Sequence, residues 1–290
     1  MIKDLDYRNL NYLIKEFPVS YSYSSTLRFS SLFSARSYKA NLDILYMAPD
    51  YSELENDTVF KSISDLKKLP YAHREVENLN KEFGGKVYAG KQAIKNKFLE
   101  TASGYDVLHL AMHTLINDSM PMYSKLVFTP ESGLNENQVF LNTSEVYKMN
   151  LKASMVTLSA CNTGAGILKK GEGIMSLARG FVFAGVPSVI MTLWEVQDEN
   201  GLEIMQLFYK HLSEGYRKDK AMQLAKMEVL NSSNMVKSHP NYWSAYIITG
   251  DTGELNIGNK KNDLWLLLLF SIPILFMFIY YKRVIYKINY

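Results

Sequence analysis

The sequence predicts an α/β fold built on a mostly parallel sheet with helices on both faces. Short apolar runs at 105–113, 155–160, 187–194 and 245–250 have the uniformly hydrophobic character of strands buried on both sides. Helical patterns lie between these runs, and alternating strands and helices are typical of a parallel sheet covered on both faces. A composition of 47% hydrophobic and 21% charged residues over 290 residues indicates a globular chain.

Local patterns place the elements in order along the chain. Residues 40–48 predict the first strand, which the turn at Pro49 ends, and the polar residues of 50–68 predict a loop with room for a short helix. Apolar residues at helical spacing predict a helix over 71–83, and Gly84 is a plausible residue to end it. The remaining elements are a short strand at 87–90 and helices at 91–100, 173–185, 199–215 and 217–231.

The charge and cysteine content exclude several classes of function. The formal charge of the chain is +3. The five basic residues of 260–290, set against Asp263, give +4, so subtraction leaves −1 for residues 1–259. A nearly neutral globular part has no basic surface for phosphate backbones, so we expect no nucleic-acid partner. The single Cys161 excludes an internal disulfide framework and a zinc site built on several thiolates.

The run of residues 264–281 is uncharged and mostly apolar over 18 positions, which predicts a transmembrane helix. At about 1.5 Å per residue it covers roughly 27 Å, close to the hydrocarbon thickness. Trp265 and Tyr280 sit where interfacial aromatic residues lie, and Pro273 would kink the helix. A buried core helix is the alternative interpretation.

The domain organisation follows from this span. We expect one α/β domain over 1–251, a polar linker over 252–263, the span over 264–281 and a short basic tail over 282–290. The N-terminal residues carry charge and lack an apolar signal-peptide core. The expected location is therefore the membrane, crossed once, with the body of the chain in the cytoplasm.

Two residues at strand ends carry the candidate chemistry. His113 closes one predicted strand and Cys161 follows another, and reactive groups of parallel sheets collect at the carboxyl ends of strands. A nearby imidazole can convert a thiol to the thiolate that attacks a substrate. Taken singly, Cys161 also fits a buried apolar residue and His113 a buried structural imidazole. Their separation of 48 residues, with His first, matches the caspase pattern of about 50.

Other motifs are read as structural. His109 and His113 form HxxxH, but the zinc-peptidase motif requires Glu where this chain has Leu110, so we expect no metal. His109 is interpreted as a structural residue that helps to orient the catalytic pair. The glycines of 164–173 fit no phosphate-binding motif, so no nucleotide is expected.

Several blocks in order resemble the CHAT domain, a family of bacterial caspase-like peptidases in the clan of separase and caspase. The resemblance runs from about residue 10 to 251. The blocks are HLAMHT, SEVYKMNLKASMVTLSACNTGAG, GEGIMSLARGFVFAGVPSVIMTLWEVQD, LFYKHLSEG and YWSAYIITGD. The resemblance implies a caspase-like α/β fold and peptide-bond hydrolysis without a cofactor, with His113 as the base and Cys161 as the nucleophile. It also implies an oxyanion hole made by the backbone amides of Cys161 and Thr114, a position that is usually Gly in related enzymes.

The resemblance suggests three further residues for the substrate pocket. Glu172 is expected to shape the cleft or, as the alternative, to stabilise the start of a helix by its charge. Trp194 and Asp198 match a W-x-V-x-D pattern at the lip of the pocket for the residue before the cut. Asp198 would then select a basic side chain, while its alternative role is that of a helix N-cap.

Two functions follow from these features. The first is a membrane-anchored cysteine endopeptidase that cleaves a protein partner near the lipid surface. Family members often carry tetratricopeptide repeats ahead of the domain, and this sequence shows none. The chain is then expected to be either a truncated relative or a protein regulated by a separate partner with such repeats. The alternative is a catalytically weak interaction module held at the membrane, with Thr114 marking an altered oxyanion hole.

Overall fold

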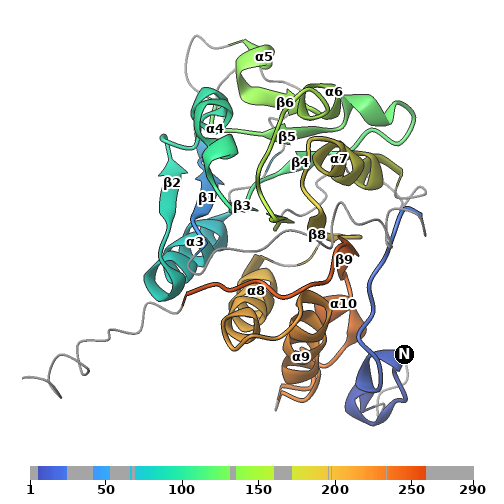
Figure 1. Cartoon of the computed structure of the whole chain (residues 1–290). Coiled ribbons are helices and arrows are strands. Elements are labelled where there is room, and N and C mark those ends of the chain that lie inside the picture. The colour runs from blue at the N-terminus through green and yellow to red at the C-terminus, as the bar shows by residue number, and fades with distance from the viewer. Residues whose placement is uncertain are drawn as a thin grey trace, which may run out of the picture. The chain divides into compact units, whose positions relative to one another are not determined.

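A six-stranded sheet forms the centre of the fold, in the order β2-β1-β3-β7-β8-β9 (Figure 1). The computed structural model describes residues 6–24, 42–52, 66, 69–130, 135–159, 172–194, 196, 198–232 and 234–258. The strands are β1 (Ile44–Pro49), β2 (Lys86–Gly90), β3 (Val107–Leu110), β7 (Met155–Leu158), β8 (Ser188–Thr192) and β9 (Tyr246–Gly250). All neighbouring pairs are parallel except β8 and β9, which confirms the predicted mostly parallel sheet.

Helices cover both faces of this sheet. The α-helices are α3 (Pro70–Phe83), α4 (Lys95–Thr101), α5 (Glu136–Val139), α6 (Thr143–Val146), α7 (Glu172–Phe183), α8 (Asp198–Ser213), α9 (Lys218–Leu230) and α10 (Pro240–Trp243). Short 3-10 turns lie at Tyr7–Asn9, Leu13–Lys15, Ala102–Gly104 and Pro121–Tyr123. One core joins the sheet to α3, α8 and α9, and the other joins it to α4, α6 and α7. The layering is therefore the one that the alternation of strands and helices predicts.

Successive residues of a strand point to opposite faces, which explains the uniformly apolar runs. In β1, Ile44 and Tyr46 belong to the core under α3, α8 and α9, whereas Leu45 and Met47 belong to the other core. All of these side chains are fully buried. A strand covered on both faces has no polar face, so its sequence shows no alternation.

The predicted end of α3 is confirmed at Gly84, whose N–H donates to the carbonyl of Asn80 at 2.8 Å. The next residue, Gly85, has φ +125°, and a Cβ there would lie 2.4 Å from the carbonyl oxygen of Ile44. Only glycine fits this close approach of the chain to β1.

A second, three-stranded antiparallel sheet was not predicted. It contains β4 (Thr114–Leu115), β5 (Lys125–Val127) and β6 (Phe140–Asn142), in that order. Strands of two or three residues are too short to show a period of two, so the sequence pattern does not reveal them. This sheet begins directly after His113 and therefore bears on the candidate site.

The N-terminal segment pairs with the outer edge of β9. Tyr21 donates its N–H to the carbonyl of Ile248 at 2.8 Å and accepts from the N–H of Gly250 at 2.9 Å. These two main-chain bonds form an isolated parallel bridge between Tyr21 and Thr249. An edge strand covered in this way offers fewer unpaired groups to another chain.

The compact unit of the fold extends to Gly258, beyond the boundary expected at residue 251. Leu255 and Ile257, in the expected linker, are buried in the core with α8 and α9. Within the described residues, no helix combines the length and the hydropathy needed to cross a membrane. The predicted span at 264–281 lies outside those residues.

A buried lysine makes the stability of the fold sensitive to pH. Lys226 on α9 is 8% exposed, and burial lowers its pKa from 10.5 to about 8. Since one pKa unit corresponds to about 1.4 kcal/mol, we expect Lys226→Met to raise the free energy of unfolding at pH 7 by about 3 kcal/mol. Between pH 8 and 10.5 the unfolded chain binds more protons than the folded one, so the parent gains stability as the pH rises.

Urea unfolding of the parent and Lys226→Met at pH 7 to 10.5 measures this effect. The difference between the two proteins should be largest below pH 8 and should vanish near pH 10.5. Lys220→Met, the same substitution on the same helix, should keep the pH slope of the parent. A constant difference between Lys226→Met and the parent at all these pH values would contradict the prediction.

Candidate active site

His113 lies in the segment that joins β3 to β4, three residues after the end of β3. Its side chain is 1% exposed. The imidazole packs against the ring of Tyr51, with 4.7 Å between ring centroids and 47° between planes. The candidate base is thus a buried side chain at the carboxyl edge of the central sheet.

The hydroxyl of Tyr51 holds the main chain of His113 in place. Val127 donates its N–H to the carbonyl of His113 at 3.0 Å, which is one rung of an antiparallel ladder. In the second rung, the Tyr51 Oη accepts from the N–H of His113 at 3.0 Å and donates to the carbonyl of Val127 at 2.8 Å. Burial raises the pKa of the Tyr51 hydroxyl, so it remains a neutral donor and acceptor.

Sequence reasoning missed Tyr51, although its position offered a signal. Tyr51 lies two residues after the end of β1, and β1 is the parallel neighbour of β3. Residues just beyond adjacent parallel strands meet at one edge of a sheet. The sequence pattern of residues 50–68 predicts a loop with room for a short helix and assigns no role to Tyr51, which lies at the start of this segment.

Thr114 begins β4, and its side chain is fully buried. Thr114 is the register partner of Leu126 on β5. Because the neighbouring pair of His113 and Val127 carries the ladder bond, the pair of Thr114 and Leu126 is a non-hydrogen-bonded one. The N–H of Thr114 is therefore directed away from β5.

The end of β7 lies beside the end of β3. Leu110 and Leu158 are register partners and the last residues of their strands. The pairing continues one residue further, since Ser159 donates its N–H to the carbonyl of Leu110 at 3.0 Å. Cys161, two residues beyond Ser159, lies outside the described residues.

His109 belongs to a buried polar network on the face of α3 and α8. Its Nε2 lies 2.7 Å from Oε1 of Glu75 on α3, and its Nδ1 lies 3.1 Å from the hydroxyl of Tyr209 on α8. All three side chains are buried. Burial raises the pKa of the Tyr209 hydroxyl, which also lies 3.4 Å from Thr157 Oγ1 on β7. Both ring nitrogens of His109 are thus occupied in linking strands to helices, as a structural role requires.

Of the three residues proposed for the substrate pocket, only Trp194 has a described side chain. Its half-buried indole follows β8, and Nε1 donates to the carbonyl of Asn241 on α10 at 3.2 Å. Glu172 is the first residue of α7, and Asp198 is the first residue of α8. The helix at 199–215 was thus expected to begin one residue later than it does.

Among the described residues no cluster of three metal-ligating side chains occurs, and the absence of a cofactor stays a prediction.

Comparison with known proteins yields one family. The model of the CHAT domain matches residues 2–251. Tetratricopeptide repeat protein 28 of Homo sapiens is 23% identical over 218 residues, which cover 65% of this chain and 9% of that protein. The Mus musculus protein of the same name shows the same identity and coverage. This chain therefore spans about a tenth of the length of these curated relatives.

The chain is also similar to solved structures, two of which follow. The Saccharomyces cerevisiae separase–securin complex at 3.0 Å resolution has a TM-score of 0.47 and 15% identity, covering 83% of this chain and 14% of that chain. The Arg-specific cysteine proteinase gingipain R has a TM-score of 0.40 and 11% identity, covering 75% of this chain and 50% of that chain.

Proposed function

The chain belongs to the CHAT domain family, and from this premise we propose that it is a cysteine endopeptidase in which His113 activates Cys161. The observation that carries the proposal is the register of two strands. Leu110 of β3 and Leu158 of β7 are register partners. His113 follows Leu110 by three positions, and Cys161 follows Leu158 by three positions. The segments that follow two adjacent parallel strands leave the sheet at the same edge, so residues equally far from the two strand ends emerge there together.

The proposed reaction is acyl transfer through the thiol. The imidazole of His113 takes the proton of Cys161, and the thiolate attacks the carbonyl carbon of the scissile peptide bond. The N–H groups of Thr114 and Cys161 stabilise the oxyanion, and the ladder geometry that turns the Thr114 N–H away from β5 supports this role. His113 then protonates the leaving amine, and water hydrolyses the thioester to release the acid and the thiol.

Alkylation of the only thiol tests the proposal. We expect the rate of iodoacetamide modification of Cys161 to rise with a midpoint well below the ordinary cysteine pKa of about 8.5, because the imidazolium stabilises the thiolate. His113→Gln should return the midpoint to the ordinary value, whereas His239→Gln, a histidine at the cap of α10, should leave it low. A midpoint near 8.5 in the parent, together with no cleavage of any peptide in a library varied at the residue before the cut, would favour the catalytically weak interaction module.

Substrate selection is assigned to the start of α8. We propose that Asp198, with Trp194 and Glu172 at the cleft, favours a basic residue before the cut. A peptide library varied at that residue should give cleavage after Arg or Lys, and Asp198→Asn should remove the preference.

A regulator with tetratricopeptide repeats is proposed because the human and mouse relatives are named for such repeats. Adding a purified repeat protein to the same assay tests for activation.

We further propose that residues 264–281 anchor the enzyme in a membrane, with the body in the cytoplasm. The support is the uncharged run of 18 residues with basic residues beside it.

Synthesis of the full chain in the presence of liposomes, followed by flotation, should find the protein in the lipid fraction. Ile272→Lys should lower the floated fraction, since a lysine at the centre of a span costs about 3 kcal/mol. Ile285→Lys, the same substitution beyond the span, should leave it unchanged, and equal flotation of Ile272→Lys and the parent would contradict the anchor.

A further inference from the structure

The strand β2 is an open edge of the central sheet. Among the described parts of the chain, β2 pairs with β1 and with no other strand. Its residues are half-buried or exposed, whereas those of β1 are buried throughout. One row of main-chain N–H and C=O groups of β2 therefore faces away from the sheet, as in strands that accept an added strand.

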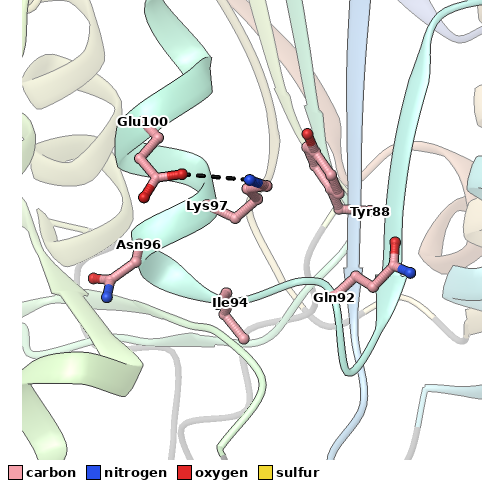
Figure 2. A pocket seen from close by; sticks show the side chains of 6 residues that line it. All are labelled: Tyr88, Gln92, Ile94, Asn96, Lys97 and Glu100. Atoms are coloured by element: carbon pink, nitrogen blue, oxygen red, sulfur yellow. Dashed lines mark hydrogen bonds and ion pairs between the residues drawn. The ribbon is translucent and has the colours of Figure 1, made fainter.

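A pocket of about 370 Å³ lies beside this edge, between β2 and α4. Figure 2 shows Lys97 of α4 lying between Glu100 and the ring of Tyr88. The lining residues are Tyr88, Gln92, Ile94, Asn96, Lys97 and Glu100. An aromatic ring together with two amide side chains can contact both the apolar and the hydrogen-bonding parts of a peptide.

The pocket lies on the face of the sheet where an added strand would place every second side chain. Tyr88 packs against the core under α4, so it points to that face. A strand added to β2 would lie about 4.8 Å outside it, with alternate side chains on the α4 face. One of these side chains would enter the pocket while the main chain pairs with β2.

The charges around the pocket favour an acidic occupant. Lys86 is exposed, and its Nζ lies 5.2 Å from the centroid of the Tyr88 ring. Lys97 Nζ lies 5.8 Å from the same centroid and 3.4 Å from Oε2 of Glu100. Two ammonium groups against one carboxylate leave a positive excess at this edge. Lysines on an edge strand also discourage pairing between sheets, but that role needs no adjoining pocket.

We infer that the β2 edge and this pocket form a docking site for an extended, acidic segment of a partner protein. The segment adds to the sheet as a strand outside β2 and places one side chain in the pocket. This site is separate from the proposed catalytic pair and does not depend on peptidase activity. Direct binding therefore tests it whether or not the chain cleaves peptides.

The probes are three capped twelve-residue peptides, added to the full chain and followed by fluorescence anisotropy. In the first, glutamate alternates with valine; in the second, lysine replaces glutamate; in the third, two central residues of the acidic peptide are prolines. We expect the acidic peptide to bind at least tenfold more tightly than the other two. The lysine peptide lacks charge complementarity, and the prolines remove main-chain donors.

Variants of the chain locate the site. Lys86→Gln with Lys97→Gln should weaken binding of the acidic peptide at least tenfold, while Lys210→Gln on α8 should leave it unchanged. Amide hydrogen exchange in β2 should slow when the acidic peptide binds, and exchange in β9 should not change. Binding that is absent, or that is equal in the double variant, would overturn the inference. Self-association of the double variant without peptide binding would show that the two lysines only guard the edge, which also overturns it.

Discussion

Replacing Cys161 by Ala is expected to lower the rate of peptide cleavage by about 10⁴- to 10⁶-fold, because the thiolate that attacks the carbonyl is lost. His113→Ala should lower the rate by a similar factor, since without the base the thiol remains protonated at neutral pH. Residues that act as one unit are not additive, so the double variant should be no slower than either single one. Steady-state rates on one cleaved library peptide measure all three.

The structure indicates that His113→Ala keeps the main-chain contacts of the parent, and it offers His109→Gln as the control. The two main-chain bonds that fix His113 involve its N–H and carbonyl, so His113→Ala keeps them. His109→Gln alters the other histidine of the HxxxH pair, which lies in the network with Glu75 and Tyr209, and should reduce stability more than cleavage per folded molecule. A double variant that is slower than both single ones by the product of their effects would show that the two residues act independently. That result would rule out the proposed pair.

Breaking the ion pair between Lys218 and Asp251 is expected to cost about 3 to 5 kcal/mol of the free energy of unfolding. Lys218 is fully buried, and its Nζ donates to Asp251 Oδ2 at 2.8 Å and to the carbonyl of Gly253 at 2.9 Å. Burial lowers the pKa of Lys218 despite the carboxylate, so the ammonium depends on these partners to remain charged. Asp251→Asn removes the carboxylate that compensates this charge, and Lys218→Met removes the ammonium from a carboxylate that keeps the N–H of Gly253 as a donor.

Urea unfolding of the two single variants and the double variant separates the cost of one missing partner from the value of the pair. The double variant should lose less stability than the sum of the single losses, because both charges of the ion pair are gone. Lys237→Met is the matched control, since its ion pair with Glu203 at 2.6 Å is 27% and 35% exposed. We expect that control to lose less than about 1 kcal/mol. Equal losses in Lys218→Met and Lys237→Met would contradict a special role for the buried pair.

The sequence was sufficient for the elements that are long or buried on both faces. The six strands of the central sheet and the helices α3, α7, α8 and α9 follow from apolar runs and helical spacing. The three-stranded sheet after His113 was missed, because two or three residues carry no readable period. Residues 252–258 read as a polar linker, yet they are held by contacts that local composition does not reveal, such as the burial of Leu255 and Ile257.

The candidate site was predicted only in part, for a similar reason. His113 was identified by its place at the end of an apolar run, and it lies at the carboxyl edge of the sheet as expected. Tyr51 contacts it across 62 positions of sequence, and no single-sequence pattern joins two residues so far apart. Cys161, Glu172 and Asp198 keep their assigned roles as predictions, since the described side chains do not include theirs.

The bridge of Tyr21 on β9 limits how copies of this chain can assemble. Growth of an open fibre by edge-to-edge pairing requires two free edges on each subunit, one to accept the preceding copy and one to receive the next. Tyr21 already occupies part of the β9 edge, whereas β2 pairs with no further segment in the described part of the sheet. Pairing of β2 with β2 of a second copy would produce a closed two-fold dimer, in which polymerisation stops after one step.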